Sequence, residues 1–114
     1  SINTLTNGAA KAGAITLDGG GSNALALSFS GGATINALAG KNATGRGGDI
    51  TIGSTLTPSL AIAGDGRITA ETKGKGDGGF LNLNAVSSIN LSNGITATTQ
   101  TSGSGDGGRI DISA

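Results

Sequence analysis

Short stretches in which apolar and polar residues alternate recur along the chain, and each follows a glycine-rich turn. In the clearest copies, after Gly79 and Gly108, apolar residues occupy every second position, as in Leu81 and Leu83. Such alternation predicts a β-strand with one buried and one solvated face. The last glycine of each turn lies at position 13, 48, 79 or 108, in steps of 35, 31 and 29 residues. This spacing predicts a solenoid whose coils differ in loop length.

Each repeat is expected to contain three short strands separated by turns. The clearest repeat has apolar pairs at Leu81/Leu83 and Ile89/Leu91, and a third alternating strand that begins at Ile95. The earlier repeats follow the same plan, with pairs at Ile50/Ile52, Leu60/Ile62 and Ile68/Ala70, and before them Ile15/Leu17, Leu25/Leu27 and Ile35/Ala37. One coil of such strands cannot close a core, so each strand is expected to pair in parallel with its equivalent one coil away.

The predicted fold is therefore all-β: a right-handed parallel β-helix of about four coils without capping elements, the handedness following the rule for parallel crossovers. The repeats span about 1–44, 45–75, 76–104 and a partial 105–114. A sandwich of antiparallel strands is the competing fold, but it predicts no equivalence of positions from repeat to repeat. The expected interior columns contain Ile15, Leu17, Ile50, Ile52, Leu81, Leu83, Ile89 and Leu91, with Ile110 and Ile112 continuing the first two columns.

The two ends of the chain carry apolar residues that we expect to take part in end-to-end stacking: Ile2 and Leu5 at one end, Ile110 and Ile112 at the other. Residues 1–8 resemble residues 88–94, which indicates that the chain enters in mid-coil. Coil ends without caps expose unpaired strand edges that favour further pairing. The expected partner is thus either a flanking repeat of a longer chain or a second copy, stacked head to tail.

Composition narrows the choice of function. Aromatic residues make up 2% of the chain, and seven basic residues balance seven acidic ones without a cluster, so nucleic-acid binding is not expected. No apolar run is long enough to span a bilayer. The chain has no cysteine and no histidine, which removes disulfides and the commonest metal ligands. No cofactor is predicted. Disorder is the alternative for so polar a chain, and the regular alternation argues against it.

Candidate chemistry is limited to a few carboxylates and asparagines. Asp77 and Asp106 occupy equivalent turn positions, so a Ca²⁺ ion could bridge them, although a solvated turn explains them as well. Arg46 occupies the same column and is expected to face Asp77. Asn42 and Asn90 stand in sequons for N-glycosylation, or serve as outward-facing polar residues.

An enzyme is not expected. Some β-helices act on polysaccharides with acidic clusters in a groove, but Asp49, Asp65 and Asp111 fall at non-equivalent positions. The aromatic residues that could form a sugar platform, Phe29 and Phe80, are expected to pack in the interior. A polysaccharide-acting fragment is kept as a minor alternative.

The repeat sequences Gly-Asp-Gly-Gly-Arg-Ile-Asp-Ile (105–112) and Ile-Asn-Leu-Ser-Asn-Gly-Ile-Thr-Ala-Thr-Thr (89–99) resemble the coils of filamentous-haemagglutinin-like exoproteins of bacterial two-partner secretion systems, in particular cyanobacterial ones. The resemblance covers residues 45–114 and is looser before them. It implies a right-handed β-helix, export through an outer-membrane partner, and a role as an extracellular adhesin or fibre shaft. We therefore expect a structural rod segment at the bacterial surface or, as the alternative, a subunit of a head-to-tail filament.

Overall fold

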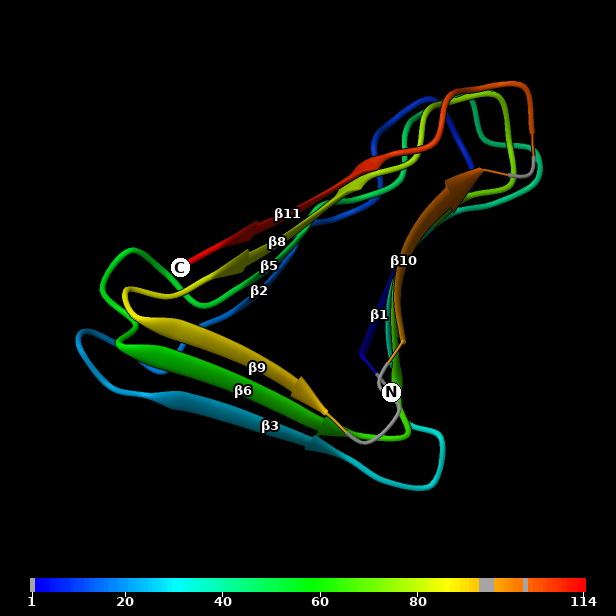
Figure 1. Ribbon diagram of the computed structural model, residues 1–114. Helices are drawn as coiled ribbons and strands as arrows, with labels where there is room; N and C mark the ends of the chain where they lie inside the picture. The colour runs from blue at the N-terminus through cyan, green and yellow to red at the C-terminus, as the bar shows by residue number, and fades with distance from the viewer. Residues whose placement is uncertain (1, 93–95, 102) are drawn as a thin grey trace.

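The chain forms a parallel β-solenoid of about three turns, each built from three strands (Figure 1). A computed structural model describes residues 2–92, 96–101 and 103–114, so the predicted strand start at Ile95 lies outside the described residues. Within those ranges the regular structure is entirely β, with no helix. The predicted fold class is confirmed. Three complete turns are present, with one further strand before them and one after, instead of about four coils.

The strands stack into three parallel sheets, here numbered by the order in which a repeat enters them. Sheet 1 contains β2 (Ile15–Leu17), β5 (Ile50–Ile52), β8 (Phe80–Asn84) and β11 (Arg109–Ser113). Sheet 2 contains β3 (Leu25–Phe29), β6 (Ser59–Gly64) and β9 (Ser88–Ser92). Sheet 3 contains β1 (Ile2–Thr6), β4 (Thr34–Ala39), β7 (Arg67–Thr72) and β10 (Thr96–Thr101). The shortest extent of the molecule is 19 Å, and four stacked strands account for about 14 Å of it, at three spacings of about 4.8 Å.

The register places equivalent residues of successive coils side by side. Sheet 1 aligns Ile15, Ile50, Leu81 and Ile110 in one column, and Leu17, Ile52, Leu83 and Ile112 in the next. Sheet 2 aligns Leu60 with Ile89 and Ile62 with Leu91. These alignments follow from alternation, because a slip of one residue would turn every apolar side chain of a strand toward water.

The core lies between the three sheets, as the nearly end-on view in Figure 1 shows. Ile50, Ile52, Leu81 and Leu83 are fully buried in it. The outermost members of the columns are not: Leu91 is 41% exposed, Ile110 41% and Ile112 55%. Leu91 continues the column of the buried Ile62, and it is exposed because β9 is the last strand of sheet 2 in the described part of the chain.

Chain entry also differs from the expectation in one respect. Residues 1–8 resemble residues 88–94, but β1 pairs with β4 of sheet 3, whereas β9 belongs to sheet 2. Ile2 therefore lies beside the buried Ile35 and faces inward. Leu5 lies beside Leu38 in a column that continues to Glu71, so its side chain is on the outer face of sheet 3 and 59% exposed. Leu5 belongs to the end strand β1, but its side chain does not face the core.

Glycines allow the coils to approach closely where sheet 3 leads into sheet 1. We call this edge, formed by residues 7–14, 40–49, 73–79 and 103–108, the glycine-rich corner; it projects beyond the sheets in Figure 1. A Cβ atom on Gly48, Gly79 or Gly108 would collide with the carbonyl oxygen of Gly13, Gly48 or Gly79 respectively, each one coil earlier. The regular recurrence of glycine is thus a packing requirement of the stacked backbone.

Candidate functional site

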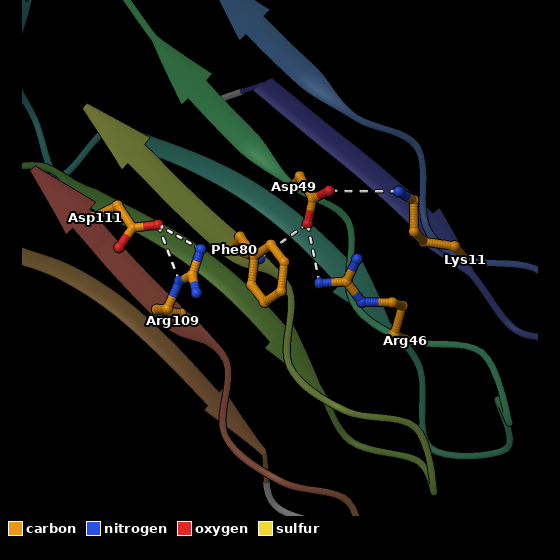
Figure 2. A network of polar contacts seen from close by, with 6 residues as sticks. All are labelled: Lys11, Arg46, Asp49, Phe80, Arg109 and Asp111. Atoms are coloured by element: carbon orange, nitrogen blue, oxygen red, sulfur yellow. Dashed lines mark hydrogen bonds and ion pairs between the residues drawn. The ribbon is translucent and has the colours of Figure 1, made fainter. Parts of the chain in front are cut away.

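The most organised group of polar side chains lies on the outer face of sheet 1, where the strands begin. The guanidinium carbon of Arg46 lies 4.3 Å from the centre of the Phe80 ring, and that of Arg109 lies 5.2 Å from it. Figure 2 shows the ring between the two cations, which come from the coils on either side of it. Each such contact contributes on the order of 0.5–1 kcal/mol at an exposed site. The stack therefore ties three successive coils together.

Asp49 is the anionic centre of this group. Its Oδ1 accepts a hydrogen bond of 3.0 Å from the Phe80 N–H and lies 3.1 Å from Arg46 Nη2, while its Oδ2 lies 3.4 Å from Lys11 Nζ. Arg46 Nη2 is buried and makes an ionic contact here, not a directed hydrogen bond. Burial by itself raises the pKa of Asp49, but the Phe80 N–H and then the charges of Arg46 and Lys11 outweigh it, so the pKa lies below its ordinary value of 3.8.

A second ion pair continues the group toward the last strand. Nε and Nη2 of Arg109 both lie 2.9 Å from Asp111 Oδ2 (Figure 2). Both side chains are more exposed than those of Arg46 and Asp49, so this pair contributes little to stability. It does hold the Arg109 guanidinium in place beside Phe80.

Two expectations about this region are wrong. Phe80 does not pack in the interior: it precedes the inward-facing Leu81, so alternation turns it outward, and it is 36% exposed. Arg46 does not pair with Asp77, because Asp49 lies three residues further along in its own coil and binds its guanidinium. Phe29, by contrast, packs against the core, in space that a side chain on Gly66 would occupy.

Asp77 and Asp106 lie in adjacent coils, as their spacing predicts. The Asp77 Oδ1 atom accepts a 2.8 Å hydrogen bond from the Asp106 N–H, so this carboxylate links two successive coils. Three or more acidic side chains do not gather anywhere in the described residues in a way that could hold a metal ion. Asn42 and Asn90 are both exposed, the first in the glycine-rich corner and the second on the outer side of β9.

The open ends of the solenoid form the second candidate site. At the N-terminal end a cavity of about 250 Å³ opens between the first strands, lined by Ile2, Leu17, Leu27, Ser28, Phe29, Ala33, Thr34 and Ile35. At the C-terminal end Leu91, Ile110 and Ile112 are exposed. Each end presents the cross-section of the core together with the edges of the last strands. This arrangement suits strand addition better than the binding of a compact ligand.

The remaining carboxylate weighed for catalysis lies apart from these sites. Asp65 accepts a 3.4 Å hydrogen bond from the N–H of Gly32 at the turn between sheets 2 and 3. In the described part of the chain no helix has the length and apolar character needed to cross a membrane. Comparison with models of known protein families, with curated proteins and with solved structures finds no match.

Proposed function

We propose that this chain is a structural rod segment of an extracellular bacterial surface protein or fibre. The observation that carries the proposal is that the three sheets run in unbroken register through every coil described, with the same apolar columns inside. Backbone hydrogen bonds along one axis stiffen such a solenoid without a disulfide or a metal ion. The outer faces supply ion pairs and exposed polar residues, which keep the rod hydrated.

The extracellular placement is inferred from the likeness of residues 89–99 and 105–112 to filamentous-haemagglutinin-like repeats. Two features are consistent with it. A chain without cysteine keeps the same covalent structure in an oxidising extracellular compartment. The glycine columns suit a repeat that must stack on either side. On this proposal the partners are flanking coils and an outer-membrane secretion protein, and the chain acts through its length and stiffness.

Antibodies raised against the purified 114-residue chain test the proposal on the bacterium that makes it. We expect gold-labelled antibody to decorate thin fibres on intact, unpermeabilised cells. Labelling that appears only after the envelope is opened would overturn the extracellular placement, and labelling of compact particles instead of fibres would overturn the rod.

A further inference from the structure

We infer that the N-terminal coil is a docking surface for the C-terminal coil of a second copy of this chain, joined head to tail through sheets 1 and 3 and the glycine-rich corner. The inference rests on the proposed rod, and it assigns the coil that flanks the N-terminal end to a second copy of the chain. Three features of the described residues point to a second copy: strand geometry, charge and an otherwise unexplained glycine.

A single rigid-body shift of a second copy along the solenoid axis extends sheet 1 and sheet 3 at the same time. In sheet 3 the next strand after β10 would be β1 of the second copy, and in sheet 1 the next strand after β11 would be its β2. Both placements correspond to a shift of four coils, since each of these sheets has four strands. The shift continues the core columns, so that Ile110 and Ile112 cover Ile15 and Leu17 of the second copy.

Sheet 2 does not join across this junction. It has three strands, so β9 and the next β3 are separated by two strand spacings, about 10 Å. The junction is therefore made by two sheets and the corner. It leaves a slot bordered by Ile89 and Leu91 of one copy and by Leu25 and Leu27 of the next.

Charge favours head-to-tail stacking over the other orientations. The corner column reads Lys11, Arg46, Asp77 and Asp106 from the first coil to the last, two cations followed by two anions. A ladder of backbone hydrogen bonds links these positions. The Ala12 N–H donates to the Arg46 carbonyl at 3.1 Å, the Gly47 N–H to the Asp77 carbonyl at 2.9 Å, and the Gly78 N–H to the Asp106 carbonyl at 2.8 Å. Continued by one step, the ladder directs the Gly107 N–H to the Lys11 carbonyl of the second copy. Asp106 then becomes the column neighbour of Lys11, whose ammonium in the single chain lies 3.4 Å from Asp49 Oδ2, whereas two like ends would bring equal charges together.

Gly13 is a glycine for which the backbone of the single chain gives no packing reason. It shares a column with Gly48, Gly79 and Gly108, in each of which a Cβ would strike a carbonyl oxygen of the preceding coil. In the single chain a Cβ on Gly13 would meet nothing closer than the Thr4 side chain at 3.4 Å, and Gly13 is not among the residues with positive φ. The carbonyl of Gly108 in a preceding copy supplies the missing reason for a glycine.

The test is a comparison of assembly by the purified wild-type chain and two variants, followed by sedimentation and negative-stain electron microscopy over a wide range of concentration. We expect the wild type to form fibres one solenoid wide, and Gly13→Val to sediment as a single chain with the circular dichroism of the wild type. Ala14→Val adds the same side chain to an adjacent exposed position on the outer face and is expected to assemble like the wild type.

Charge exchange gives a second readout that does not depend on Gly13. Asp106→Lys should fold, because it keeps the backbone N–H that Asp77 binds and places a cation in the coil next to that carboxylate, but it should lose assembly against Lys11. Combining it with Lys11→Glu should restore fibres. A wild type that stays monomeric at every concentration, or a Gly13→Val chain that assembles as readily as the wild type, overturns the inference. Fibres labelled on cells together with a monomeric purified chain would leave the proposed rod intact and assign the docking surface to a flanking coil.

Discussion

Truncation of Leu83 should destabilise the protein far more than truncation of Ile112, although the two residues are neighbours in one core column. Leu83 is fully buried between Ile52 and Ile112, so Leu83→Ala removes buried methyl groups and leaves a closed cavity. Such changes cost about 2–5 kcal/mol. Ile112 is 55% exposed, so Ile112→Ala gives up less than half of a side chain's burial and leaves no enclosed cavity, which costs about 1 kcal/mol.

The assay is urea unfolding followed by far-ultraviolet circular dichroism at low protein concentration, since the chain lacks tryptophan and tyrosine. The unfolding midpoint of Leu83→Ala should fall well below that of Ile112→Ala while the m-value stays the same. A domain of this size has a stability of roughly 6–17 kcal/mol, so both variants are expected to fold. Equal losses for the two variants would refute the assignment of the core column.

Leu83→Asp extends the same reasoning to charge. The carboxylate would be buried between apolar side chains without a partner, which costs more than the domain can lose, so the variant should not fold. A soluble Leu83→Asp protein with the wild-type circular dichroism would show that the position is not interior.

Three further outcomes are expected from urea unfolding. Gly79→Ala should lower the free energy of unfolding by several kcal/mol, because its Cβ would collide with the backbone of the preceding coil. Gly107→Ala adds a Cβ with nothing within 4 Å of it and should change that free energy by less than about 1 kcal/mol. Equal effects of the two variants would contradict the close packing of the glycine-rich corner. Phe80→Ala should lower the free energy of unfolding by about 1–2 kcal/mol. Phe80→Leu should lower it less, since leucine keeps the apolar contact and loses only the attraction for the two guanidinium groups. A Phe80→Ala variant as stable as the wild type would show that the stack does not stabilise the fold. Asp49 has a lowered pKa in the folded state, so its contribution to stability is present above about pH 4 and is lost as the pH falls through the folded-state pKa. Asp49→Asn should be less stable than the wild type at pH 7 by about 1 kcal/mol, and this difference should shrink below pH 4. A difference that stays constant with pH would contradict the ionic role of Asp49.

Much of the architecture could be predicted from the sequence because the determining interactions repeat. Alternation sets which side chains of a strand face inward, and the recurring glycines mark where successive coils touch. Ile15, Ile50, Leu81 and Ile110 could therefore be aligned by counting residues, and they lie side by side in sheet 1. The outward orientation of Phe80 could also be predicted from alternation, because Phe80 must face outward if Leu81 faces inward. The expectation that Phe80 is buried followed from its apolar character alone.

The tertiary structure decided what depends on which segments become neighbours. β1 resembles β9 in sequence, yet the stacking of the first coil places it beside β4, because several strand edges could accept the same alternating segment and local pattern does not choose among them. The partner of Arg46 was decided in the same way: Asp77 shares its column, but the turn brings Asp49 to its guanidinium. Exposure of Leu91 likewise follows from the number of strands in sheet 2. The sequence by itself determined which residues face inward and the repeat that stacks them, because these depend on local alternation and backbone contact. Only the tertiary structure determined the neighbours of each strand and charge, because those depend on where the coils begin and end in space.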